Sequence, residues 1–415
     1  MVTMNSAQIF SMALGLVRPW KISDIKFNNE GSAKELHIHI DFDRGAKFND
    51  EHGNACTVHD TVDKTWRHLN FFEHQCYLHC RVPRIETKDG KVHLIDVPWA
   101  RKNIGFSLMF EAYVMSLIEN EMPVNKAGKL LGEDAHRLWT IFNFWIKRAI
   151  DADQPEQVIN LGVDETSSKR GHRYVTIGVD LDKRRVLHVT EGKGKSTINS
   201  IKQYFESKGM DPEKVKNACI DLSPSFIAGL KEYFPNTEIH FDKFHVVQLL
   251  NRAMDQVRIL ERKEHNELKG TKYAFLKRNA NLTDQRQQEI ENLTMLFPTL
   301  GEAYRLKELF FDLWEMNTTD EAEAFLEHWC ADVEKLNSNP FLEFVKTVKA
   351  HKTGILNYIG SKISNGILEG INCKIQLAKR RARGYRDIEN YMNMIYFLCG
   401  KLKFNYNCCY PLTSS

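Results

Sequence analysis

The sequence predicts a multidomain chain whose central part is an α/β domain, built on a mixed sheet with helices on both faces. Three observations lead to this prediction. The chain has 415 residues, more than one typical domain, so two or three domains are expected. Between residues 158 and 242, three strand-like runs follow one another and then alternate with helical runs. From residue 243 to 360, apolar residues recur almost only at helical spacing.

The composition is that of an ordinary globular protein and excludes several classes. Hydrophobic residues make up 42% and charged residues 27% of the chain. No run of about 18 apolar residues occurs, so no membrane-spanning helix is expected. Nine cysteines are an odd number in a long chain, which favours a reducing cytoplasm over a disulfide-stapled secreted fold. The net charge is only +3, so any nucleic-acid surface must come from local clustering of cations.

The N-terminal region begins with a strand. Residues 34–45 alternate between apolar and polar side chains, which is the period of a half-buried strand. His37 and His39 are interpreted as side chains on one face of that strand. In residues 51–86 the alternation is weak, and cysteines and histidines crowd together.

This Cys/His-rich stretch predicts a structural zinc site. Cys56 and His59 form one C-x2-H pair, and Cys76 and His79 form another sixteen residues later, with Cys80 directly after it. Zinc takes four such ligands in a tetrahedron and can hold loops together without a large core. The alternative is that these side chains pack in a small core without metal.

Residues 105–150 predict a helix-turn-helix domain. A helix over 105–120 is followed by a short one over 124–131, a turn at Gly132 and a longer helix over 133–150. The last helix could enter a major groove, whereas an ordinary helix pair without DNA contact is the alternative. The side chains expected to face a groove are Asp134, His136, Arg137, Asn143 and Lys147.

The central domain follows a polar, turn-prone linker at 151–157. Strands are expected at 158–165, 172–181, 184–192, 214–222 and 237–242, with helices at 196–209 and 223–234. The helical stretch from residue 243 to 360 is interrupted by Gly270, Pro298 and Pro340 and therefore predicts several helices. Residues 364–402 are expected to be helical on both sides of a basic segment near Gly384.

Acidic residues at strand ends predict a metal site. Asp164 and Asp221 each end an apolar strand, and such ends can converge at one edge of a sheet. Two divalent ions about 4 Å apart need several acidic oxygens, and Glu369, on a later helix, can supply a third carboxylate. The alternative is that these acids are solvated turn and surface residues. Spacing alone does not exclude the other strand-end acids, Asp180, Asp182 and Asp242.

A dense cluster of cations follows Glu369. Six cations occur in thirteen residues, together with Tyr385, and this density favours a phosphate-contacting face over a merely solvated helix face. The cations are Lys374, Lys379, Arg380, Arg381, Arg383 and Arg386.

Several long blocks resemble DDE transposases of the ISL-three insertion-sequence family. The catalytic blocks of that family are similar to LGVDETSSKRGHRYVTIGVD, ACIDLSPSFIAGL, HFDKFHVVQLLNRAMDQVR and SNGILEGINCKIQLAKRRARGYRDIENYMNMI. Its zinc-binding region resembles HDTVDKTWRHLNFFEHQCYLHCRVPRI and VPWAR, and its helix-turn-helix resembles residues 108–150. One departure is that His59 and His79 stand where related proteins often have cysteines. The blocks occur in order over nearly the whole chain.

The resemblance implies a ribonuclease-H-like catalytic core with a helical insertion, preceded by zinc-binding and helix-turn-helix modules. It implies that Asp164, Asp221 and Glu369 are the catalytic, magnesium-binding triad, separated by an insertion within the 147 residues between the last two. Asn365 and Asn372 match the family's asparagine-bearing block. The implied divisions are 1–104 (strand and zinc), 105–150 (helix-turn-helix), 158–242 (core), 243–360 (insertion) and 361–402 (end of the core).

The implied activity is DNA transposition. Two Mg²⁺ ions, for which Mn²⁺ can substitute, would support cleavage at the element end and then strand transfer to target DNA. The implied partners are the terminal inverted repeats, target DNA and a second copy of the chain, in a bacterial cytoplasm at the nucleoid. Two alternatives stay open at this point. One is a catalytically inactive or domesticated DNA-binding regulator, and the other is a ribonuclease-H-like structure-specific nuclease.

Overall fold

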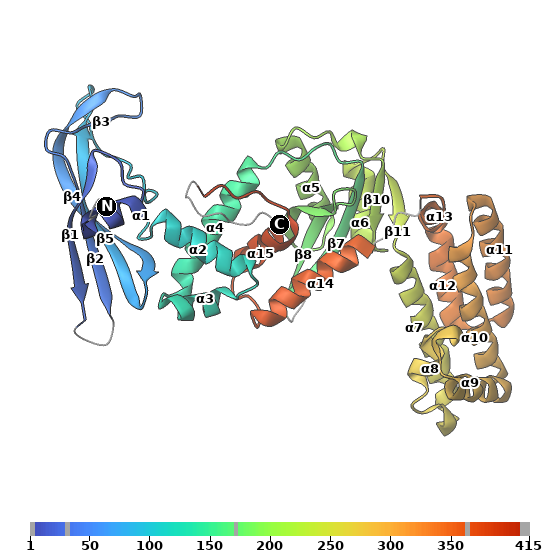
Figure 1. The fold of residues 1–415 in the computed structure, drawn as a ribbon. Helices are drawn as coiled ribbons and strands as arrows, with labels where there is room; N and C mark the ends of the chain where they lie inside the picture. Colours follow the sequence, from blue (N-terminus) through green and yellow to red (C-terminus); the bar gives the residue numbers. More distant parts are fainter. Residues whose placement is uncertain (1–4, 30–33, 170–172, 362–365, 407–415) are drawn as a thin grey trace. The chain divides into compact units, whose positions relative to one another are not determined.

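The chain folds into two compact units. The computed structural model describes residues 5–29, 34–169, 173–361 and 366–406 (Figure 1). One unit comprises residues 1–145 and 403–415, and the other comprises residues 146–402. The boundary falls inside helix α4 (Ala135–Ala152), a few residues before the polar stretch at 151–157 where a linker was expected.

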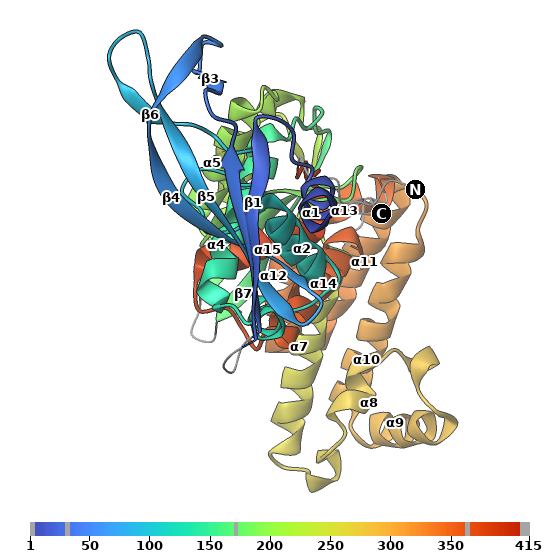
Figure 2. The same ribbon diagram turned by 60° about the vertical axis from the view of Figure 1, so that its left-hand side comes forward.

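The first unit is built on a six-stranded sheet with the order β1-β2-β5-β4-β3, in which β6 also pairs with β5. The hairpin of β4 and β5 is long and runs from the pair Val58–Ile85 to the pair Phe71–His74 (Figure 2). The expected strand at 34–45 is present as β2 and pairs in parallel with β5. The elements of this part are α1 (Ser6–Ala13), β1 (Trp20–Asn28), β2 (Glu35–Phe42), β3 (Lys47–Asn49), β4 (Ala55–Phe71), β5 (His74–Glu86) and β6 (Val92–Leu94).

This sheet has its own apolar core, so the prediction that residues 51–86 are loops held by metal is wrong. Alternate side chains of β2 and β5 are buried, and they pack with Trp20, Trp66 and Trp99. The cysteines of β5 belong to this set, because a thiol in such a place behaves as a small hydrophobic group. The buried alternate residues are Leu36, Ile38, Ile40, Cys76, Leu78, Cys80 and Val82.

Three helices complete the first unit and include the predicted helix-turn-helix. They are α2 (Leu108–Glu119), α3 (Val124–Leu131) and α4, and Gly132 between the last two has a left-handed φ of 67°. Ser107 caps α2 by accepting a hydrogen bond from the Phe110 N–H. The backbone of Arg67 in β4 bonds to Gly105 and Ser107, so the helices are attached to the sheet. Sheet and helix-turn-helix therefore belong to the same compact unit.

The second unit contains the predicted mixed sheet, with the order β11-β10-β7-β8-β9. The strands β7, β10 and β11 are parallel, whereas β8 and β9 are antiparallel to their neighbours. The elements are β7 (Asn160–Lys169), β8 (Arg173–Asp180), β9 (Arg185–Glu191), α5 (Lys195–Ser207), β10 (Asn217–Ile220), α6 (Pro224–Tyr233) and β11 (Glu238–Phe241). Each matches an expected strand or helix within a few residues.

Helices cover both faces of this sheet. Gly178 of β8 lies against Ile201 of α5, and Gly162 of β7 lies against Leu368 of α14 (Gly366–Arg381). Gly178 is paired with Val163, the neighbour of Gly162, and successive strand residues point to opposite faces. Helices α5 and α14 therefore lie on opposite sides of β7, and Asp164 points to the side of α14.

The predicted helical insertion separates β11 from α14 and extends away from the sheet (Figure 1). Its apolar side chains join the core cluster that includes those of the sheet. Within the described ranges, no helix is both long and apolar enough to cross a membrane. The helices are α7 (Lys243–Arg262), α8 (Lys272–Leu276), α9 (Asp284–Leu296), α10 (Pro298–Phe310), α11 (Thr319–Leu336), α12 (Asn339–Ala350) and α13 (Lys352–Ser361), and α15 (Ile388–Cys399) follows α14.

Candidate active site at the carboxyl edge of the sheet

Asp164 and Asp221 lie side by side at one edge of the second sheet. Strand β10 pairs with β7 in parallel, up to the pair Cys219–Gly162. Continuing this register by two residues places Asp221, which directly follows β10, beside Asp164. Neighbouring strands are about 4.8 Å apart, and residues in register point to the same face. Both carboxylates are thus on the face that α14 covers.

Helix α14 is attached to β7 by a row of polar contacts. The Asn372 side-chain N–H donates to Asp164 Oδ2 at 2.6 Å. One turn further along the helix, Gln376 donates to Thr166 Oγ1 at 2.7 Å. About one turn beyond that, Lys379 Nζ donates to the Ser167 carbonyl at 2.6 Å. Buried Leu368, Ile371 and Ile375 supply the apolar side of the same contact. The helix therefore follows the strand from the acidic edge outward.

Glu369 lies one helical turn before Asn372, in the first turn of α14. Side chains three positions apart are neighbours on a helix surface, so Glu369 is close to the acidic edge. It is exposed, however, and in the described part of the chain no three His, Cys, Asp or Glu side chains converge closely enough to hold a metal ion. The predicted triad is therefore represented by an adjacent Asp pair and a nearby, exposed glutamate. Asn365, which matched the same family block, lies outside the described residues.

Burial has the largest effect on the acids of this edge, and the positive charges of His245 and Lys193 act against it. Burial raises the pKa of Asp164 to about 6, and the negative charge of Asp221 acts in the same direction. The hydrogen bonds from the Glu165 N–H and from Asn372 oppose that shift. Burial also raises the pKa of Glu165. A cation bound by these carboxylates would favour their ionised forms and so oppose the effect of burial.

The donor set fits a hard divalent cation. Asp164 and Asp221 offer carboxylate oxygens, and the Asn372 Oδ1 atom is buried and has no hydrogen-bond partner among the residues that the structure describes. Oxygen donors of this kind suit magnesium and manganese better than zinc.

Two further residues belong to this edge. Strand β11 pairs with β10 up to Ile220–Phe241, so Asp242 continues the same register row beside Asp221. Asp242 is buried and caps α7, and His245 Nε2 lies 3.8 Å from its Oδ2. Asp242 was one of the strand-end acids that the spacing in the sequence did not exclude. His245 carried no such signal, because it sits in a helix.

The other strand-end acids are not at this edge. Asp180 pairs with Leu161, near the start of β7, and accepts a hydrogen bond from the Lys183 N–H in a turn. Asp182 accepts a hydrogen bond from Asn160. Both acids therefore lie toward the opposite end of the strands.

The prediction of one zinc site from the two C-x2-H pairs is wrong. Val58, between Cys56 and His59, pairs with Ile85, whereas Cys76 pairs with His68 at the other end of the hairpin. The ten residues from Val58 to His68 span roughly 30 Å of strand.

Strand geometry also separates the ligands of the second pair. Cys76 and Cys80 point into the apolar core, whereas His79 points to the other face and lies 2.9 Å from His37. His39 stacks on His79 there, as expected for residues on one strand face. Ligands on opposite faces of a sheet cannot share one ion.

The predicted DNA-contacting residues of the helix-turn-helix differ in their surroundings. Arg137 is exposed, but it forms an ion pair with Glu133 and its guanidinium lies 4.2 Å from the centre of the Phe106 ring. Asp134, His136 and Lys147 are exposed, and Asn143 is half-buried.

The basic segment lies on α14 and in the turn after it. Lys374, Arg380, Arg381, Arg383 and Arg386 are exposed, whereas Lys379 is occupied by its contact with Ser167. Tyr385 was expected among the phosphate-contacting residues, but this is wrong. Its side chain is buried, and its ring lies 5.3 Å from that of Tyr391.

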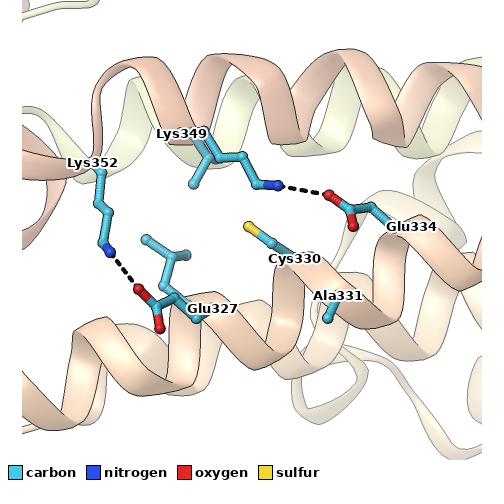
Figure 3. Close-up of a pocket in the computed structure, with 8 residues that line it drawn as sticks. Glu327, Cys330, Ala331, Glu334, Lys349 and Lys352 are labelled. Carbon is cyan, nitrogen blue, oxygen red and sulfur yellow. Dashed lines mark hydrogen bonds and ion pairs between the residues drawn. The ribbon is translucent and has the colours of Figure 1, made fainter.

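A separate cavity of about 370 Å³ lies in the helical insertion, between α11 and the helices after it (Figure 3). Two ion pairs cross it, Lys349–Glu334 at 2.6 Å and Lys352–Glu327 at 2.7 Å. Its lining includes none of the acids of the sheet edge, so it is not part of the candidate site.

Comparison with known proteins gives consistent matches over the chain. A family model described as transposase matches residues 161–395. Another, described as the helix-turn-helix domain of transposase family ISL3, matches residues 95–146. The chain is 24% identical over 375 residues to the transposase for insertion sequence element IS1001 of Bordetella parapertussis, covering 87% of this chain and 91% of that protein. It is 22% identical over 419 residues to the transposase for insertion sequence element IS1557 of Mycobacterium tuberculosis, covering 92% and 93%.

Proposed function

This chain belongs to the ISL3 family of insertion-sequence DDE transposases, and from that premise we propose that its acidic sheet edge is the metal-dependent centre for DNA cleavage and strand transfer. The chain is a DNA transposase with a DDE catalytic domain and a helix-turn-helix DNA-binding domain. The proposal concerns which residues carry the chemistry. The observation that supports it is the register that sets Asp164 beside Asp221, with α14 bonded to Asp164.

In this proposal the catalytic domain has a ribonuclease-H-like core. The strand order of the second sheet, β9-β8-β7-β10-β11, supports this proposal. Its first strand in sequence, β7, is central, and β8 and β9 follow it as a meander. The first acid is on the central strand, the second follows the fourth strand, and Glu369 is on a helix beyond the insertion. The carboxylates of these residues would hold two Mg²⁺ ions, or Mn²⁺ in their place.

Each part of the chain has a distinct task in the reaction. When bound, the ions activate the attacking oxygen and stabilise the charge that develops on the phosphate. Asp164 and Asp221 would hold them, and Glu369 would supply the third carboxylate. The exposed cations of α14 bind the DNA backbone close to these acids. The helix-turn-helix binds the terminal inverted repeats, and one copy of the chain serves each element end.

The direct test is replacement of Asp221 by Asn in an end-cleavage assay with Mg²⁺. This change keeps the shape but removes a charged ligand, so we expect cleavage to fall by about a thousandfold or more, which corresponds to several kcal/mol of lost stabilisation. Asp182→Asn is the matched control, because this acid lies toward the opposite end of the sheet. Full activity in Asp221→Asn would refute the assignment.

A further inference from the structure

The amide of Asn372 has one hydrogen-bonded side and one without a partner. Its N–H group donates to Asp164 Oδ2 at 2.6 Å. Its Oδ1 atom is buried and accepts no hydrogen bond within the described part of the chain. A buried acceptor left unpaired is unfavourable, and such an atom in a native site calls for a missing partner.

Chemistry fixes which way this amide points. An ionised carboxylate only accepts hydrogen bonds, so the N–H side of Asn372 must face Asp164. The opposite orientation would place two acceptor oxygens against each other. Because the amide is planar and small, Oδ1 stays close to the carboxylate that its N–H holds. The missing partner must therefore be a donor or a cation that lies beside Asp164.

We propose that Asn372 Oδ1 is a ligand of the divalent ion held by Asp164 and Asp221, an inference that rests on the proposed function. Carboxamide oxygens are ordinary ligands of hard divalent cations. Asn372 then has two tasks, since its N–H orients Asp164 and its carbonyl oxygen completes the coordination. A neutral ligand adds an oxygen to this acidic edge without adding a further negative charge. Glu369, one turn earlier on α14, approaches from the same side.

A purely structural role is the competing explanation. Asn372 is also the first of three polar contacts between α14 and β7, and it could serve only to attach the helix. Gln376 provides the matched control, because it makes an equivalent contact one turn away, to Thr166 rather than to an acid. Removal of the Gln376 side chain weakens the attachment of α14 and leaves the acids untouched.

The test is calorimetric titration of Mn²⁺ into the full chain without DNA. We expect Asn372→Ala to raise the Kd for Mn²⁺ by about tenfold or more, the effect expected when a metal site loses a ligand or its support. Gln376→Ala should bind Mn²⁺ as the unmodified chain does. Equal binding by Asn372→Ala and the unmodified chain, or equal weakening by both variants, would overturn the role of Asn372.

Asn372→Asp supplies a second readout that does not depend on activity and covers the case in which the alanine variant fails to fold. It keeps an oxygen ligand, loses the N–H donor and adds a charge beside two acids. Its melting temperature without metal should therefore fall below that of the unmodified chain, and added Mn²⁺ should raise it by more. A rise equal to or smaller than that of the unmodified chain counts against the proposal.

The same titration separates failure of this inference from failure of the proposed function. Asp221→Asn should lose most of its Mn²⁺ binding. If it binds Mn²⁺ as tightly as the unmodified chain, or if the unmodified chain binds none, the acidic edge is not the metal site and both proposals fall. If Asp221→Asn behaves as expected and Asn372→Ala does not, only the role of Asn372 is refuted.

Discussion

A buried histidine shows how single residues join the two parts of the first unit. His68 of β4 lies with its Nδ1 atom 2.7 Å from Ser107 Oγ, which also accepts the Phe110 N–H at the start of α2. The direction of the hydrogen bond between His68 and Ser107 depends on the tautomer of the ring. Burial, assisted by the positive charge of Arg67, lowers the pKa of His68 to about 4. A neutral ring thus connects the sheet to the helix cap.

This histidine predicts a stability loss in mild acid. In the unfolded chain His68 takes up a proton near its ordinary pKa of 6.5, whereas the folded chain resists protonation down to about 4. Its contribution is complete above pH 6.5 and declines as the pH falls, by up to about 3 kcal/mol. Urea unfolding at pH 7 and pH 5 should show a larger loss for the unmodified chain than for His68→Asn. His52→Asn, at an exposed position, should behave like the unmodified chain. Identical pH dependence in all three would contradict this account.

At the residue scale, the sequence predicted the acids but not their partners. Asp164 and Asp221 could be singled out because each follows an apolar run at a strand end. The family resemblance singled out Asn372, but its bond to Asp164 depends on a contact made across the fold. The burial of Tyr385 likewise follows from its packing against Tyr391, which local composition does not report.

At the scale of elements, the hairpin of β4 and β5 explains why the zinc prediction failed. The alternation in β5 is visible once Cys76 and Cys80 are counted as apolar residues beside Leu78 and Val82. When Cys76 and Cys80 are counted as metal ligands instead, the alternation typical of a strand is no longer apparent. Burial raises the pKa of both thiols to about 12, as expected for cysteines that pack as small apolar groups. The Cys/His-rich composition of residues 51–86 thus fits either a zinc site or a strand hairpin, and the packing of the two cysteines in the apolar core favours the hairpin.

Helix α14 combines an apolar side, a polar row toward β7 and exposed cations, and the cations predict a specific salt dependence. Replacement of Lys374, Arg380 and Arg383 by Gln should lower the slope of log Kd against log salt for duplex DNA by about 3, since each phosphate that a cation no longer neutralises lowers it by roughly 0.9. The measurement is fluorescence anisotropy over a salt series.

The control for this prediction changes the net charge by the same amount elsewhere. Lys335, Lys346 and Lys349 lie in the insertion, and each forms an ion pair with an acid. Their replacement by Gln should leave the slope close to that of the unmodified chain. Equal slopes for the two triple variants would mean that overall charge, rather than α14, governs DNA binding.

At the scale of the whole molecule, the order of elements was predictable, but the assembly of the site was not. The strands of the second sheet are apolar runs, and the insertion shows regular helical spacing, so both could be recognised locally. The hydrogen bond between Asn372 and Asp164 joins residues 208 positions apart, and no local pattern predicts it. The family resemblance supplied the link between Glu369 and the two aspartates. The contacts of Arg67 and His68 that attach the first sheet to the helix-turn-helix likewise have no local signal in the sequence.

Each copy of the chain contributes its acidic edge, whereas an insertion sequence has two ends. This difference predicts how mixtures of the unmodified chain and an inactive variant behave. If one copy acts at each end, joining of both ends to target DNA needs two active copies, as in a symmetric dimer. Asp221→Asn leaves the helix-turn-helix intact, so it should still occupy ends. At constant total protein, an equimolar mixture with the unmodified chain should retain about half of the cleavage on a one-ended substrate but only about a quarter of the two-ended strand transfer. Gel analysis of both products gives the two fractions. If cleavage and strand transfer both fell to about half, a single copy would serve the two ends in turn.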